Sequence, residues 1–144
     1  MAHTRGPRDR LVRNGVLLSL VGLLMGMVTY SLPNPRMGLS AHVGTVMTGI
    51  FVVAMGAAWD TVVLTPGAER TAIRLFLVGN WGSALSVFLA ALLDTRDATP
   101  IHGAAVSAAA WKETLATASL TVFAVVLLAG VAMVLYGLRK RAAA

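Results

Sequence analysis

Residues 114–138 read TLATASLTVFAVVLLAGVAMVLYGL, an unbroken run without a charged side chain. At about 1.5 Å of rise per residue, a helix of this length crosses the ~30 Å hydrocarbon layer of a bilayer. Three more uncharged runs of 19 to 23 residues precede it, at 14–35, 37–59 and 75–93. The sequence therefore predicts an all-α integral membrane protein built as a four-helix bundle.

The composition agrees with a membrane environment. Hydrophobic residues make up 57% of the chain and charged residues 12%, and the mean hydropathy is +0.76. Such a chain has too few polar side chains to cover a water-soluble globule. We expect residues 1–144 to form a single membrane domain with a short basic arm at 1–10. The expected helices cover about 11–31, 41–64, 71–93 and 113–137. The first run lacks a small-residue cleavage pattern, so we expect it to be retained as a helix.

The charges predict the topology. Nine of the twelve Lys and Arg residues fall at the span ends on one side, and three fall on the other. The larger set is Arg5, Arg8, Arg10, Arg13, Arg70, Arg74, Arg139, Lys140 and Arg141, and the smaller set is Arg36, Arg96 and Lys112. The positive-inside rule then places both termini in the cytoplasm of a multi-pass protein of the inner (plasma) membrane. The basic excess behind the net charge of +6 is this topological signal, with some attraction to anionic membrane lipid, and we expect no nucleic-acid partner.

The absence of cysteine limits the chemistry. With no cysteine in the chain there is no disulfide, iron–sulfur cluster, thiolate-ligated haem or cysteine nucleophile. Any metal must be held by histidine, carboxylate or carbonyl groups. The sequence also contains no phosphate-binding loop, dinucleotide-binding glycine motif, zinc-protease motif or hydrolase nucleophile elbow.

His42 is the strongest candidate for chemistry, because no other ionisable residue follows it until Asp60. An imidazole at membrane depth can ligate haem iron, relay a proton or hydrogen-bond a neighbouring helix. Thr45 and Gly49 share its side of the helix, and Thr48 is displaced by about a third of a turn. We expect the glycine to leave room for a flat ligand over that face. Since no other histidine lies in a predicted span, a bound iron should keep an open sixth position.

Further polar side chains lie on the third and fourth predicted helices. Asn80 can form an interhelical hydrogen bond or line a cavity, and Glu113 can cap its helix or face a pocket. If the helices alternate in direction, one polar pocket in the outer half contains His42, Thr45, Ser86, Glu113 and Thr117. Asn80 lies nearer the cytoplasmic half. The candidate catalytic residues are Thr45, Thr48, Asn80 and Glu113.

Six separated pieces of the chain resemble the hydroxylaminobenzene mutases, a family of four-helix membrane enzymes. They are 22–26 (GLLMG), 34–42 (NPRMGLSAH), 49–53 (GIFVV), Trp59, 79–81 (GNW) and 111–113 (WKE). The piece at 34–42 is the most specific. The resemblance implies an isomerase that rearranges an arylhydroxylamine, a small aromatic substrate, to an aminophenol by moving the hydroxyl from nitrogen to the ring.

A more distant similarity is to the styrene oxide isomerases, on the stretch from Ala41-His42 to Gly49. It implies that His42 is the axial ligand of a ferric haem b at the subunit boundary of a homotrimer, with Gly49 beside it. The iron then acts as a Lewis acid, and Thr45, Thr48, Asn80 or Glu113 hold the migrating oxygen. The chain has Thr48 where those isomerases have an asparagine, and 86–88 (SVF) offers no phenol. An epoxide is therefore the less expected substrate.

Three other functions stay open at the level of sequence. The first is an epoxide-to-aldehyde isomerase of the styrene oxide isomerase type. The second is a non-catalytic membrane transporter or scaffold, which should bind no haem and form no product. The third is a haem redox or sensor protein, which should cycle between ferric and ferrous states, whereas an isomerase should turn over without an electron donor.

Overall fold

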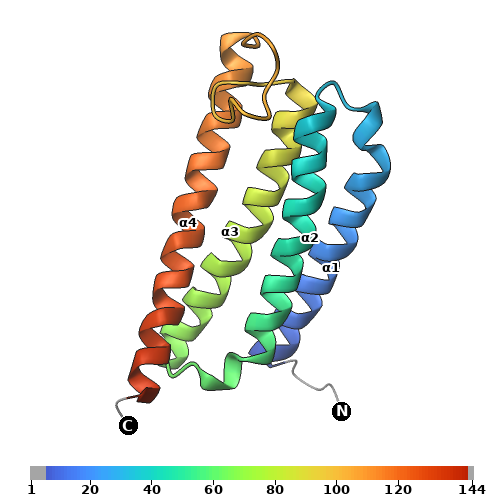
Figure 1. Cartoon of the computed structure of the whole chain (residues 1–144). Helices are drawn as coiled ribbons and strands as arrows, with labels where there is room; N and C mark the ends of the chain where they lie inside the picture. Colours follow the sequence, from blue (N-terminus) through green and yellow to red (C-terminus); the bar gives the residue numbers. More distant parts are fainter. Residues whose placement is uncertain (1–5, 143–144) are drawn as a thin grey trace.

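The structure, a computed structural model, describes residues 6–142 and the side chains of residues 6–139 (Figure 1). Its long helices are α1 (Pro7–Val28), α2 (Pro35–Ala57), α3 (Pro66–Leu93) and α4 (Ala110–Ala142). Two short 3₁₀ helices, η1 (Thr29–Ser31) and η2 (Trp59–Thr61), follow α1 and α2. Each of the four long helices is long and apolar enough to cross a membrane. The predicted all-α membrane fold is confirmed.

All four long helices begin earlier than the sequence suggested, and three of them begin at a proline. Pro7, Pro35 and Pro66 stand at the first helical position, four to six residues before the expected starts. A proline there loses no hydrogen bond, since the first amides of a helix have no intrahelical acceptor. Asn34 and Thr65 cap α2 and α3 by accepting from the backbone N–H three residues on. Residues 7–10 of the expected arm are thus helical, and residues 1–5 lie outside the described part.

The second helix ends at Ala57, well before the expected residue 64. Trp59 is buried, and its Nε1–H donates to Oε1 of Glu69 at 3.0 Å, which holds the chain in a turn toward α3. The backbone N–H of Val63 then donates to the carbonyl of Gly137 at 3.2 Å. The connection from α2 to α3 is therefore anchored to both α3 and α4.

The four helices lie side by side in the order α1, α2, α3, α4, with α1 and α4 at opposite edges (Figure 1). The packed pairs are α1 with α2, α2 with α3, and α3 with α4. Glycines allow the close approaches: a Cβ at Gly22 would lie 2.7 Å from the Val46 nitrogen, and one at Gly79 would lie 2.5 Å from Cα of Leu127. One buried cluster nevertheless joins side chains of all four helices, and Nε1–H of Trp81 on α3 donates to Oδ1 of Asn14 on α1 at 3.2 Å, so the row is a four-helix bundle with a shared core.

Both ends of the described chain lie at the same end of this row, together with the 58–65 connection (Figure 1). The α1–α2 and α3–α4 connections lie at the opposite end. The predicted separation of the basic residues follows, because Arg36, Arg96 and Lys112 belong to that opposite end. The assignment of the terminal end to the cytoplasm stays a prediction.

Candidate functional site

His42 lies in the second turn of α2 and points its ring at α1. The ring atom Nδ1 is 2.7 Å from the carbonyl oxygen of Gly22. Gly26, one turn further along α1, makes room for the imidazole: a Cβ there would lie 2.6 Å from Nδ1 and 2.8 Å from Cε1. The half-buried ring is therefore held by a hydrogen bond and by the surface of α1.

This hydrogen bond decides which ring nitrogen carries the proton. A carbonyl oxygen only accepts hydrogen bonds, so Nδ1 of His42 must be the donor. In a neutral imidazole the other nitrogen, Nε2, then keeps its lone pair. Within the described residues Nε2 has no hydrogen-bond partner. Metal-binding histidines in proteins are commonly oriented in this way, with the non-ligating N–H on a backbone carbonyl.

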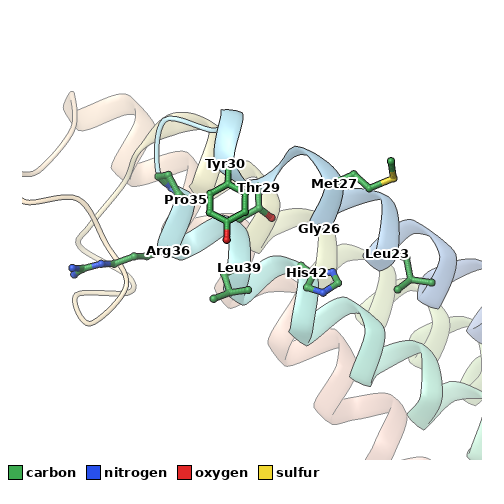
Figure 2. Close-up of a pocket in the computed structure, with 9 residues that line it drawn as sticks. All are labelled: Leu23, Gly26, Met27, Thr29, Tyr30, Pro35, Arg36, Leu39 and His42. Atoms are coloured by element: carbon green, nitrogen blue, oxygen red, sulfur yellow. The ribbon is translucent and has the colours of Figure 1, made fainter.

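The His42 cavity, as we call it, has a volume of about 540 Å³ and lies between the end of α1 and the start of α2 (Figure 2). It is lined by Leu23, Gly26, Met27, Thr29, Tyr30, Pro35, Arg36, Leu39 and His42. Most of these side chains are apolar. Figure 2 shows Arg36 extending away from His42, so the imidazole and the guanidinium lie at different parts of the cavity.

Thr45 and Thr48 lie beside α3 rather than in the His42 cavity. Thr45 is buried, and its hydroxyl donates to the sulfur of Met25 on α1 at 3.6 Å. Both threonines line a separate cavity of about 110 Å³ between α2 and α3, together with Ser40 and Ser83. This cavity is far larger than the ~10–15 Å³ that one water molecule needs.

Gly49 corrects one expectation. We predicted open space beside it for a flat ligand, but a Cβ at Gly49 would lie 2.5 Å from the nitrogen of Ser19 and 2.6 Å from the carbonyl oxygen of Gly15. The space is filled by α1, because the face of α2 that contains His42 and Gly49 is its packing face. Gly49 serves close helix contact within the chain.

Asn80 is buried in α3 and does not line the His42 cavity. Its side-chain amide donates to the carbonyl of Phe76 at 2.7 Å, one turn earlier in the same helix. The adjacent Gly79 packs on α4. The structure thus gives Asn80 a local backbone partner rather than the predicted bond to another helix.

Glu113 lies at the start of α4 with its side chain buried. Its carboxylate accepts from the backbone N–H of Arg96 at 3.0 and 3.2 Å, of Asp97 at 3.0 Å and of Ala108 at 2.7 Å. Glu113 therefore anchors the 94–109 connection. It lines a groove of about 350 Å³ with Asp97, Thr114, Thr117 and Ala118. The single outer pocket predicted from sequence is divided, since His42, Thr45 with Thr48, and Glu113 with Thr117 line three separate cavities of the chain.

Sequence reasoning missed several residues around His42. Arg36 and Leu39 line the same cavity and stand six and three residues before the histidine, so helical spacing was a usable signal for Leu39. Met27 comes from α1 and Tyr30 from η1, and no local pattern connects them with His42. The side chain of Asn34 caps α2 and also donates to the carbonyl of His102 at 3.1 Å.

The chain is similar to known proteins over most of its length. The family model described as styrene oxide isomerase matches residues 7–139, which includes the His42 cavity, the whole of α1, α2 and α3, and most of α4. The chain belongs to the styrene oxide isomerase family. Hydroxylaminobenzene mutase HabB of Ectopseudomonas oleovorans is 32% identical over 132 residues, covering 91% of this chain and 80% of that protein. Hydroxylaminobenzene mutase HabA of the same organism is 30% identical over 82 residues, covering 57% of this chain and 61% of that protein.

Both resemblances seen in the sequence are confirmed by these matches. The family name and the names of the two relatives all describe isomerases. Together with four helices able to cross a membrane, they make this chain a multi-pass membrane isomerase.

Proposed function

We propose that this protein rearranges an arylhydroxylamine to an aminophenol, and that His42 holds a ferric haem b for the reaction. The observation that supports it best is the hydrogen bond from Nδ1 of His42 to the Gly22 carbonyl, which leaves Nε2 with a lone pair beside a largely apolar cavity. The named activity of two relatives supports the choice of substrate.

The residues present fit a haem. A neutral imidazole is a common axial ligand, and an apolar cavity suits the porphyrin face. Within the described residues there is no cluster of three or more histidine, cysteine or acidic side chains, so an ion held only by the protein is poorly supported. When bound, the ferric haem supplies a Lewis acid that weakens the N–O bond without net oxidation or reduction.

The chain's own residues orient the His42 ring and surround the reacting atoms. The Gly22 carbonyl orients the His42 ring and raises its basicity as a ligand. Leu23, Met27 and Leu39 give the cavity an apolar lining, and a charge interaction at the reacting atoms is stronger in an apolar surrounding than in water. The rearrangement breaks the N–O bond, forms a C–O bond at the ortho carbon, and moves one proton from that carbon to nitrogen. Substrate and product have the same formula, so no electron donor is needed.

The hydroxyls of Thr45 and Thr48 are the candidates to hold the migrating oxygen. Both lie in the small cavity on the α3 side of α2, away from the His42 cavity of the same chain. From the family resemblance we also propose a homotrimer in which the haem lies at the subunit boundary and a second copy covers the His42 cavity. The protein then lies in the inner (plasma) membrane with both termini cytoplasmic.

The test compares wild type, His42→Ala and His102→Ala, expressed with haem precursor and purified in detergent. His102 is an exposed histidine of the 94–109 connection and serves as the matched control. We expect a Soret band and conversion of hydroxylaminobenzene in wild type and His102→Ala, and loss of both in His42→Ala. If wild type shows no Soret band, the proposed binding of haem is wrong. If haem-loaded wild type forms no aminophenol, the proposed mutase activity is wrong.

The second candidate is an epoxide isomerase, favoured by the family match over residues 7–139. The same preparations should be assayed with styrene oxide. Conversion of styrene oxide without conversion of hydroxylaminobenzene selects this candidate. No product from either substrate leaves the transporter or redox functions.

A further inference from the structure

A second cavity adjoins the His42 cavity at the end of the molecule that holds the α1–α2 and α3–α4 connections. Its volume is about 530 Å³. Two arginines line it, Arg36 at the start of α2 and Arg96 in the 94–109 connection, and Asp94 is its one carboxylate. Pro35 and Arg36 line both cavities. We call it the arginine cavity, and the proposed reaction makes no use of it.

Arg96 is held in place from two sides. Its backbone N–H donates to both carboxylate oxygens of the buried Glu113, at 3.0 and 3.2 Å. Its guanidinium donates through Nη1 to the carbonyl of Ala105. A guanidinium has five N–H donors, so most of them remain for a ligand. The guanidinium is thus preorganised by a buried anchor before anything binds.

Arg36 brings a second positive charge to the same cavity. Among the described residues its side chain has no hydrogen bond or ion pair. Asp94 forms no ion pair with either arginine in the described part of the chain. Two guanidiniums beside one cavity, neither of them ion-paired with its single carboxylate, favour an oxyanion, which arginine binds through paired N–H donors.

We propose that the arginine cavity binds the oxyanion of an amphiphile whose apolar body lies in the His42 cavity. Arg36 stands six residues before His42 on α2, about 9 Å along the helix axis, so one molecule can contact both. This inference rests on the proposed function in one respect: the oxyanion there is a propionate of the haem. A phospholipid phosphate offers the same chemistry at the membrane surface and is the other source to be tested.

The first measurement is a titration of apoprotein, produced without haem precursor, with hemin and with hemin dimethyl ester, whose propionates are uncharged. We expect wild type to bind hemin about tenfold more tightly than the ester. Arg36→Gln and Arg96→Gln should each weaken hemin binding by about tenfold and leave ester binding unchanged. Arg74→Gln removes an exposed arginine at the other end of the helices and should change neither.

The second measurement is the anionic phospholipid retained by each purified variant, read by native mass spectrometry. If hemin and the ester bind equally, and phospholipid is lost only from Arg36→Gln and Arg96→Gln, the ligand of the arginine cavity is a lipid phosphate. A haem propionate is then excluded as its ligand. Unchanged ligand preference and unchanged lipid in both variants overturn the proposal, even where wild type binds haem and is active. If wild type binds neither porphyrin, the proposed function fails and the lipid measurement alone decides.

A folding control separates binding from damage. Arg36→Lys keeps the charge but not the paired donors, so hemin affinity should fall between wild type and Arg36→Gln. The helix content of every variant should match wild type by circular dichroism, because both side chains are exposed. If Arg36→Lys binds hemin as weakly as Arg36→Gln while keeping its full helix content, the contribution of Arg36 comes from its paired hydrogen bonds.

Discussion

The contact between Gly26 and His42 allows a quantitative prediction for Gly26→Ala. The added methyl would lie 2.6 Å from Nδ1 of His42, whereas ordinary van der Waals contact begins near 3.4 Å. The ring must therefore move by about 0.8 Å or more. If the ring moves away from α1, the 2.7 Å bond to the Gly22 carbonyl lengthens beyond the usual limit of about 3.2 Å.

Loss of that bond frees both the orientation and the tautomer of the imidazole. Removing a partner that orients a metal ligand typically costs about tenfold to a hundredfold in metal affinity. We expect Gly26→Ala to bind hemin more weakly by that factor and to form less aminophenol in proportion. The lost hydrogen bond and the crowding should also lower the free energy of unfolding of the apoprotein by about 1–3 kcal/mol.

The assay is a hemin titration followed at the Soret band, beside thermal unfolding of the apoprotein in the same detergent. Gly67→Ala is the matched control, because a Cβ at Gly67 meets nothing within 4 Å. A Gly26→Ala protein that binds hemin with wild-type affinity and spectrum refutes the reasoning, since the ring then cannot be held against α1 as the structure has it.

Two further predictions concern the α1–α2 and α3–α4 connections. Glu113→Gln should raise the rate of hydrogen exchange at the amides of Arg96, Asp97 and Ala108, because a carboxamide has only one accepting oxygen. The same change should lower the free energy of unfolding by about 1–3 kcal/mol. Loss of product formation with unchanged hydrogen exchange would instead indicate a chemical role for Glu113. Asn34→Ala should lower the melting temperature more than Asn34→Asp. Aspartate keeps the cap on α2, which is worth about 1 kcal/mol, and loses only the donor to the His102 carbonyl. Equal melting temperatures of the two variants would show that the cap does not contribute.

Much of the fold was predictable because a bilayer imposes its own length scale. Four uncharged runs long enough to cross the hydrocarbon layer correspond to four helices. The helix starts were expected further into the apolar runs, whereas Pro7, Pro35 and Pro66 begin the helices. The same ring that breaks a helix interior is well tolerated at its first position, so proline alone does not distinguish an end from a beginning.

The candidate site was predictable only in part. His42 stood out because an ionisable side chain in a long apolar run is costly and needs a reason. Helical spacing placed Gly49 on its side of α2, but spacing does not say which neighbour covers that side, and α1 covers it. Glu113 appeared as a cap or an acid, whereas its three backbone donors come from residues that no helical period connects with it.

The sequence by itself determined the membrane class, the number of long helices and the end of the molecule at which each basic cluster lies, and it singled out His42 as a candidate, since these depend on local composition and period. Only the tertiary structure decided the order in which the helices pack, the contact of Nδ1 of His42 with the Gly22 carbonyl on α1, and the sharing of one cavity by Arg36 and Arg96. Those features depend on which helix faces contact one another, and in an apolar environment that choice is made by small residues and a few hydrogen bonds spread along the whole chain.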